Sequence, residues 1–407
     1  MPEIEPKVPG HDPNSSSTGM AGLAPSLAAQ QWSADANHPQ RTPGAYEWWH
    51  FEGIDSAGNG VVAMFFDGLP FHPDYLAAVS RAQRRQKSPF TIVKRELQAS
   101  YYPAAYFAVY QGGRPTARFL NLYPCGTFEG SAETPELRVG PNRLTLRTDG
   151  TFGLTVRGYP YEMHGGRPCH RTDQILTATL TFAPSFKGVQ QIRPFRPNGP
   201  GGQTHTWVIA APHGRMTGRV QHIAGSESVA LIDTAVDSLG YHDHVYGQGP
   251  LGNKLKRLAW GHAVGDTWTA AWHWAQAAGR NGPRVDGLLL FERDCKPVII
   301  ESPTFRAEQK RSTPWLVGYP GRVTMYGSDA KGNSVELLLQ QNALMDNSPF
   351  HARLDTAATL TVIGKRQYIG AGITNVLQIP HLHWPVFSDM VLMAILPIRS
   401  DDPLWRQ

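Results

Sequence analysis

The chain has 407 residues, of which 41% are hydrophobic and 17% charged, and its formal net charge is +5. This length exceeds the roughly 100 to 200 residues of an average domain, so it predicts two domains or one large β architecture. The abundance of glycine, proline and aromatic residues favours strands and turns over helices. The basic runs 80–87 and 254–257 lack interleaved aromatic residues, so we expect no nucleic-acid partner. They fit solvated loops or peripheral contact with an anionic membrane.

Three cysteines, Cys125, Cys169 and Cys295, are widely spaced and odd in number. They predict neither a disulfide framework nor a Cys-x-x-Cys site. Residues 1–40 contain no basic segment followed by an apolar stretch, so no signal peptide is expected. The longest late apolar run, 390–396, is far shorter than the ~20 residues that span a bilayer. We therefore expect a cytoplasmic protein, free or peripheral on a membrane, whose oligomeric state the sequence does not indicate.

Residues 1–40 lack a sustained apolar period, and we expect them to form a disordered leader. From Tyr46 onward, short apolar runs separated by turn residues predict an all-β sandwich or barrel architecture. These runs lie at 60–66, 104–110, 144–148, 153–157, 175–182, 205–211, 218–223, 258–275, 287–291, 297–301, 321–326, 335–340 and 359–364. A helical stripe marks 73–86, and the proline- and glycine-rich stretch 184–202 predicts a surface connection. Two β domains, 41–235 and 236–407, are the economical division.

Residues 240–247 read Gly-Tyr-His-Asp-His-Val-Tyr-Gly, the stretch densest in groups that can move a proton. As a strand, this octapeptide has two faces, because side chains alternate along a strand. His242, His244 and Tyr246 then lie on one face, and Tyr241, Asp243 and Val245 on the other. One face therefore offers an acid/base or ligand cluster. The plain alternative is a histidine-rich turn held by backbone carbonyls.

Residues 46–53 read Tyr-Glu-Trp-Trp-His-Phe-Glu-Gly and form a second dense segment. Alternation puts Glu47, Trp49 and Phe51 on one face, and Tyr46, Trp48, His50 and Glu52 on the other. Large aromatic residues on both faces are typical of a core strand. A carboxylate buried among them is costly and tends to have a raised pKa, so Glu47 or Glu52 is a candidate general acid.

Histidine stands near tryptophan in three more strand candidates, at His205-Thr206-Trp207, Trp260-Gly261-His262 and Trp272-His273-Trp274. This recurrence predicts an aromatic-walled cavity with a few proton donors, the usual composition of a small-molecule pocket. His242-x-His244 and His381-x-His383 have the spacing of some β-barrel metal sites, but we expect no metal and no other cofactor. Dinucleotide, Walker and Gly-x-Ser-x-Gly motifs are absent, which argues against nucleotide cofactors and serine hydrolysis.

Taken in order, these motifs resemble those of lipocalin-like two-barrel proteins related to carotenoid 1,2-hydratase, also called hydroxyneurosporene synthase. Fungal Diels-Alderases of decalin biosynthesis share that architecture. The similarity covers residues 42–364 and includes Ala211-Pro212 and Gly218-Arg219-Val220. It implies two lipocalin-like antiparallel β-barrel or sandwich domains with few short helices. Two departures bear on the reaction: Val245-Tyr246 replaces a frequent Asn-Trp, and His273 stands where the hydratases' acidic residue is expected.

The resemblance implies a cofactor-free enzyme that hydrates a C=C bond of a carotenoid-type hydrophobic molecule. Such a reaction needs a strong proton donor, a stabilised carbocation and a positioned water molecule. Desolvated aromatic faces stabilise a cation by roughly 1 to 2 kcal/mol each. A pericyclase or isomerase of a polyene would need shape and one or two hydrogen bonds. A lipocalin-like carrier of hydrophobic ligands would need the cavity alone, so all three functions stay open.

The candidate catalytic residues are the acid/base groups of these motifs: Asp243, His242, His244, Tyr241, Glu47 and His273. The candidate substrate-binding residues are the neighbouring aromatic and histidine side chains: Tyr46, Trp48, Trp49, His50, Trp207, Tyr246, Trp260, His262, Trp272 and Trp274. The expected partner is a hydrophobic small-molecule substrate.

Overall fold

A computed structural model of the protein describes residues 26–28, 32–39, 42–85, 95–186, 189–195, 205–224, 229–253, 255–278, 284–293, 295–300, 303–362 and 366–405. Within these residues the fold is mostly β, as the composition predicts, with two α-helices and a few short 3-10 helices. None of the described helices has the length and apolar character needed to cross a membrane.

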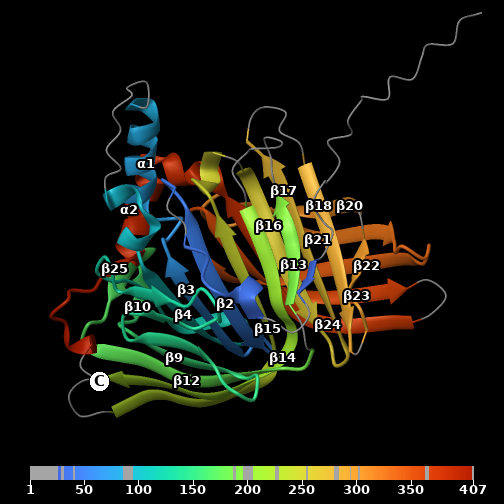
Figure 1. Ribbon diagram of the computed structural model, residues 1–407, viewed down its shortest axis with the longest axis horizontal. Coiled ribbons are helices and arrows are strands. Elements are labelled where there is room, and N and C mark those ends of the chain that lie inside the picture. Colours follow the sequence, from blue (N-terminus) through green and yellow to red (C-terminus); the bar gives the residue numbers. More distant parts are fainter. Residues whose placement is uncertain are drawn as a thin grey trace, which may run out of the picture.

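The strands form two large, mainly antiparallel sheets and one small hairpin (Figure 1). The first sheet contains β1 (Ser26–Ala28), β2 (Tyr46–Ile54), β3 (Gly60–Asp67), β4 (Ala104–Gln111), β5 (Arg114–Leu122), β6 (Phe128–Gly130), β7 (Leu137–Val139), β8 (Asn142–Leu146), β9 (Phe152–Gly158), β12 (Gln174–Pro184), β13 (Val189–Phe195), β14 (His205–Ala224), β15 (Val229–Gly247) and β25 (Leu396–Pro397). The hairpin pairs β10 (Tyr161–His164) with β11 (Arg167–His170).

The second sheet contains β16 (Leu255–Val264), β17 (Trp268–Ala277), β18 (Arg284–Glu292), β19 (Val298–Ile300), β20 (Thr304–Ser312), β21 (Gly318–Ser328), β22 (Ser334–Asn347), β23 (His351–Val362) and β24 (Arg366–Gln378). The helices α1 (Pro73–Arg85) and α2 (Pro385–Ala394) stand together at one end of the molecule (Figure 1). The 3-10 helices are η1 (Trp32–Asp35), η2 (Arg95–Leu97), η3 (Ala99–Tyr101), η4 (Leu251–Asn253), η5 (Ile379–His383) and η6 (Pro403–Trp405).

Alternating side chains give each sheet two apolar faces, which divide the core into three main parts. One part fills the inside of the first sheet around Phe51, Phe107 and Phe182. A second part fills the inside of the second sheet around Trp272 and Leu337. The largest part lies between the two sheets, so apolar packing joins the two halves of the chain.

Three expectations about chain organisation differ from the structure. Residues 32–39, placed in the expected disordered leader, are ordered, and Asp35 is fully buried. Part of the expected surface connection 184–202 is strand β13, which pairs with β14 and β1. The expected domain boundary at 235 falls inside β15, because that strand stays in the first sheet as far as Gly247. Hydrogen bonding to neighbouring strands overrides the local composition in β13 and β15. Side-chain hydrogen bonds between Asp35 and β15 and between Asn37 and β2 hold residues 32–39.

Candidate active site

Strands β2 and β15 lie side by side, so the two motifs densest in acid/base groups form one two-faced ribbon. Asp243 pairs with His50, and His244 pairs with Trp49, in antiparallel register. Paired residues point to the same face of a sheet. The predicted alternation of both motifs is therefore confirmed, and it divides the polar side chains between two clusters on opposite faces.

The inner cluster, on the face inside the first sheet, contains Asp35, His38, Glu47, His242 and His244. The Nε2 atom of His242 lies 2.9 Å from Asp35, and the Nε2 atom of His244 lies 2.8 Å from Glu47. Burial raises the pKa of Glu47, but hydrogen bonds from His244 and His38 outweigh it and bring the pKa below its usual value. The network ties residues 35–38 to β2 and β15.

Three members of the inner cluster could hold a metal ion. The candidate ligand atoms of His38, Glu47 and His244 all lie within 4.8 Å of one another. A pair of histidines and one carboxylate is a set found in zinc sites. In this structure Glu47 instead accepts hydrogen bonds, including one of 2.8 Å from the amide of Asn37. His242 contacts Asp35 and is not one of the three candidate ligands. The group His38, Glu47 and His244 therefore differs from the His242-x-His244 pair that the sequence suggests.

The interface cluster, on the face between the two sheets, contains His50, Glu52, Tyr241, Asp243 and His262. His50 lies between two carboxylates, 3.5 Å from Asp243 through Nδ1 and 3.4 Å from Glu52 through Nε2. The Nε2 atom of His262, from the second sheet, lies 2.6 Å from Glu52. The His262 ring stacks on Tyr241 with centroids 3.7 Å apart. Both sheets thus supply the acid/base groups.

Asp243 is fully buried, yet its carboxyl is held in the anionic form. Burial raises its pKa, but contacts with His50, Trp207 and His262 outweigh burial and bring the pKa below its usual value. The indole of Trp207 donates a 2.9 Å hydrogen bond to it. An anionic Asp243 cannot donate a proton at neutral pH, so the structure makes His50 the better candidate donor of this pair.

The interface cluster contains an unusual number of buried polar atoms without a hydrogen bond of standard geometry. Within the described residues these include both ring nitrogens of His50, Oε2 of Glu52, Oδ1 of Asp243 and the Tyr241 hydroxyl. Native proteins satisfy most buried polar groups, so such a concentration indicates a functional site. A substrate or water molecule in this cluster could supply the missing hydrogen-bond partners.

Two in-register rows of side chains face each other across the interface. On the first sheet the row runs from Asp243 through His50, Met64 and Tyr106 to Leu120. On the second sheet it runs from His273 through Trp260, Asn375 and Arg353 to Asp346. The polar cluster closes one end of these rows, and a cavity lies between their remaining members.

This cavity has a volume of about 140 Å³ and a mostly apolar wall. Met64, Leu120, Trp260 and Leu377 line it from the two sheets, and α2 closes one side. A cavity of this size holds one end of a long apolar molecule and not the whole of it, because pockets that enclose drug-sized ligands have volumes of roughly 300 to 1,000 Å³. Met64 and Trp260 separate the cavity from the interface cluster.

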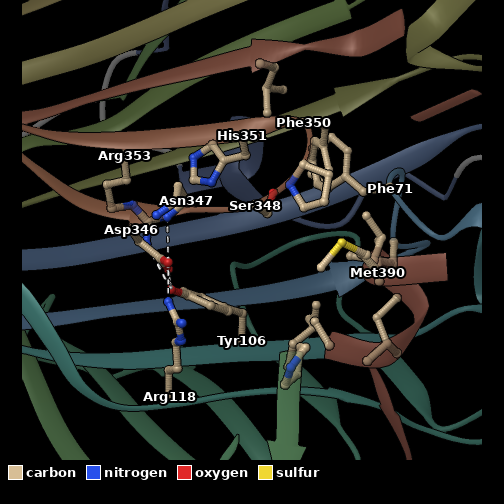
Figure 2. A pocket seen from close by; sticks show the side chains of 18 of the residues that line it. Phe71, Tyr106, Arg118, Asp346, Asn347, Ser348, Phe350, His351, Arg353 and Met390 are labelled. Atoms are coloured by element: carbon tan, nitrogen blue, oxygen red, sulfur yellow. Dashed lines mark hydrogen bonds and ion pairs between the residues drawn. The ribbon is translucent and has the colours of Figure 1, made fainter. Parts of the chain in front are cut away.

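The cavity has one polar end, where Tyr106, Arg118 and Asp346 meet, and one apolar end near Phe71 and Met390 (Figure 2). Tyr106 donates a 2.9 Å hydrogen bond to Asp346, which also pairs with Arg118. Arg353 lies 2.8 Å from the Tyr110 hydroxyl.

Charged and neutral groups are both fixed at this polar end. Burial raises the pKa of Asp346, but Arg118 and Arg353 outweigh it, so the pKa lies below its usual value. Burial, helped by Arg353, lowers the pKa of His351 to about 4. His351 is therefore a neutral imidazole, and the wall carries two guanidinium groups, one carboxylate and several neutral hydrogen-bonding groups.

The structure places the sequence-predicted residues at several sites. Among them, all within the described part of the chain, Trp260 alone lines the cavity. Those at or beside the interface cluster are Tyr241, Asp243, His50, His262, Trp207 and His273. Those on the inner face are His242, His244, Glu47, Trp49 and Tyr246.

Four further predicted residues lie elsewhere. Tyr46 and Trp48 pack in the core between the sheets, where the Tyr46 hydroxyl lies 2.7 Å from His205. Trp272 packs inside the second sheet, and Trp274 packs against Arg257, 4.7 Å from its ring centroid. Trp272 and Trp274 therefore cannot contact a ligand in the cavity. They lie on the opposite face of β17 from His273, because adjacent residues of a strand point to opposite faces.

Sequence reasoning missed the polar residues of the cavity: Tyr106, Arg118, Asp346, His351, Arg353 and Asn375. They are scattered over five strands, β4, β5, β22, β23 and β24, and form no local motif. Arg353 gave no signal either, because alternation puts it on the same strand face as Asp355 and Thr359, and such a face reads as solvent-exposed. Asp35 was missed because it lies in the expected leader.

Known proteins resemble this chain in sequence and in overall fold. No protein-family model matches the chain. A protein of Chlorobaculum tepidum named hydroxyneurosporene dehydrogenase is 24% identical over 357 residues, which cover 84% of each chain. A solved structure of the AttH-type protein NE1406 from Nitrosomonas europaea is 14% identical, covers 88% of this chain and 99% of its own, and has a TM-score of 0.54.

A solved kievitone hydratase from Nectria haematococca is 10% identical, covers 88% of this chain and 97% of its own, and has a TM-score of 0.45. A score at that level does not by itself establish a common fold. The sequence likeness to the C. tepidum protein and the fold shared with NE1406 both extend over most of the molecule. The chain is therefore similar in sequence to the C. tepidum protein and similar in fold to NE1406.

Proposed function

We propose that this protein is an enzyme that binds one end of a long apolar isoprenoid or polyene in the interdomain cavity and adds water across a C=C bond. The apolar wall of the cavity supports the substrate class. The relative from C. tepidum carries the name of hydroxyneurosporene, a carotenoid, which favours the same class of molecule.

The observation that carries the proposal is the register of the first sheet. His50, the residue between two buried carboxylates, is the cross-strand neighbour of Met64, which lines the cavity. Directly paired residues have Cβ atoms about 5 Å apart. A shift of the Met64 side chain would bring a bound alkene within reach of the imidazole, and the unbranched Met side chain adapts readily.

The chemistry balances within this cluster. His50, which lies beside Asp243 and Glu52, gives a proton to one alkene carbon, and a carbocation forms at the other. The rings of Trp260 and Tyr106 stabilise that cation. Water adds to it, and the released proton passes to Glu52 or His262 and returns to His50. The sum is alkene plus water to alcohol, with no oxidant or reductant.

The test is expression in a strain that makes an acyclic carotenoid, followed by mass spectrometry of the pigments. We expect a product heavier by one water. His50→Gln or Asp243→Asn should lower its yield roughly 100-fold or more, the usual size of a general-acid effect. The matched control is His242→Gln, which removes a buried imidazole from the opposite face of the same strand. It should leave turnover per folded molecule within a few-fold of the wild type.

Other results would contradict hydration. A product lighter by two hydrogens would favour the oxidation after which the C. tepidum relative is named. Equal losses for His50→Gln and His242→Gln would mean that the interface cluster has no special role. Stoichiometric pigment binding with no product would indicate a carrier.

A pericyclase or isomerase is the second candidate, and the cavity wall favours it. Tyr106, Arg353 and Asn375 offer hydrogen-bond donors there, while no carboxylic acid is needed. In that case Asp243→Asn would be nearly silent, and Arg353→Met or Trp260→Ala would abolish conversion of a polyene. The same set of variants therefore separates the two functions.

A further inference from the structure

Several large apolar side chains are exposed on the surface beside the cavity opening. The described residues include nine exposed large apolar side chains in all. Five form a group that we call the apolar rim, with these exposed fractions: Met163 42%, Leu316 65%, Trp384 46%, Val386 63% and Met393 44%. Single exposed apolar residues are ordinary, but a contiguous group marks an interaction site.

The rim is one continuous surface, although its members come from three segments. His170 of the β10–β11 hairpin lies 2.8 Å from the carbonyl oxygen of Met393 on α2. Phe387 of α2 stacks on Trp384 at 5.2 Å and contacts Trp315 at 6.4 Å. Met163, Trp315 and Met390 also line the cavity. The rim therefore borders the apolar end of the cavity, where Met390 lies (Figure 2).

Leu316 is held outward by a costly backbone conformation. Its φ is +64°, in the left-handed region that residues other than glycine rarely adopt. Backbone hydrogen bonds between Thr313 and Val317 close the turn that presents it. A strained, exposed leucine is expected at a functional contact and not on an ordinary solvated loop.

Basic side chains flank the rim on three elements. Arg167 is exposed on β11, Lys310 and Arg311 are exposed on β20, and Arg81 and Arg84 are exposed on α1. Figure 1 shows α1 beside α2, and the two helices are in contact. The acidic side chains nearby are Asp74 on α1 and Glu308 on β20, together with Glu162 on β10 and Asp389 on α2. Arginine and lysine around an apolar patch complement anionic headgroups.

We propose that the apolar rim docks on the surface of a bilayer that contains anionic lipid, with the cavity mouth facing the membrane. Trp384, Leu316 and Val386 enter the headgroup region, where tryptophan is favoured, and the arginines contact lipid phosphates. A long apolar substrate then passes from the bilayer into the cavity without crossing water. This docking does not depend on which reaction the protein catalyses.

The experiment is co-sedimentation of the full chain with vesicles of phosphatidylcholine alone or mixed with phosphatidylglycerol. We expect binding to the anionic vesicles that weakens with salt. The double variant Leu316→Ser/Val386→Ser should bind roughly tenfold or more weakly, because about 0.8 kcal/mol is lost for each apolar CH₂ kept in water. Arg81→Gln/Arg84→Gln should lose a similar factor at low salt and less at high salt.

The matched control is Ile369→Ser, because Ile369 is 77% exposed but is not part of the rim. It lies near the start of β24, whereas α2 follows the other end of that strand. Its binding should equal that of the wild type. Failure of the wild type to bind anionic vesicles, or an equal loss in Ile369→Ser, would overturn the proposal. So would analytical ultracentrifugation showing that the rim variants dissociate a dimer while vesicle binding stays unchanged.

Discussion

At the scale of single residues, burial and register change the chemistry of ordinary side chains. Asp67 ends β3 and pairs across the sheet with Glu47, on the inner face. Burial, with the nearby charge of Glu47, raises the pKa of its carboxyl to about 7. One of its oxygens has no hydrogen-bond partner among the described residues. The folded structure therefore disfavours the ionised form of the Asp67 carboxyl group.

The first prediction concerns the pH dependence of stability at Asp67. A folded pKa above the unfolded value means that stability is fully present below about pH 4 and is lost as pH rises through about 7. Asp67→Asn should remove this loss, so it should gain on the wild type above pH 7, by up to roughly 4 kcal/mol for a three-unit shift. Thermal melting between pH 4 and 8 measures it, and parallel curves for the two proteins would contradict it.

At the scale of elements, the pairing of β2 with β15 depends on glycines where the strands approach closely. A Cβ at Gly240 would lie 2.5 Å from the carbonyl oxygen of Glu52, and a Cβ at Gly53 would lie 2.5 Å from the side chain of Met216. Gly240 pairs with Gly53 directly beside the interface cluster. Backbone atoms cannot move aside without shifting a strand, so Gly240 limits how closely β15 approaches β2 near Asp243 and His50.

The second prediction is that Gly240→Ala lowers the free energy of unfolding by about 1 to 3 kcal/mol, as overpacking does. It should also reduce turnover, because the added methyl group separates β15 from β2. Gly318→Ala is the control, since its Cβ would meet no atom closer than 3.8 Å. Urea unfolding and product formation are the measurements. Normal activity in Gly240→Ala would show that the spacing of the two strands is not critical.

At the scale of the whole molecule, a buried ion pair and hydrogen bonds from a second arginine join the two sheets beside the cavity. Arg118 of the first sheet pairs with Asp346 of the second. Arg353 is the cross-strand neighbour of Asp346 in the second sheet, and it also donates hydrogen bonds to the hydroxyl groups of Tyr106 and Tyr110 in the first. A carboxylate thus lies between two guanidinium groups at the interface. Loss of Asp346 would leave both cations buried and poorly compensated.

The third prediction is that Asp346→Asn destabilises the protein by about 3 to 5 kcal/mol, the usual cost of removing one partner of a buried pair. Asp237→Asn, in the exposed pair with Arg215, should have little effect. Urea unfolding of both variants tests the difference. If Asp346→Asn and Asp237→Asn lowered the free energy of unfolding by equally small amounts, the Arg118–Asp346 ion pair would not hold the two sheets together.

Much of the fold could be predicted from the sequence because its signals are local. The strand candidates 60–66, 104–110 and 153–157 lie in β3, β4 and β9, and the helix predicted at 73–86 is α1. The candidates 205–211 and 218–223 proved to be one long strand, β14. The turn residues Pro212 and Gly214 between them read as a break, but pairing with β12 and β15 keeps the chain extended.

The sequence by itself determined which residues of 46–53 and 240–247 share a face, because strand alternation is a property of the backbone. It did not determine what lies opposite each face. Only the tertiary structure brought Asp35 to His242, His262 to Glu52, and Asp346 to Arg118. It also decided that the cavity adjoins the face of His50 and not that of His244. The reason is that these contacts join positions far apart in the chain. The packing of one sheet on the other brings His262 to Glu52 and Asp346 to Arg118, and the packing of residues 32–35 inside the first sheet brings Asp35 to His242.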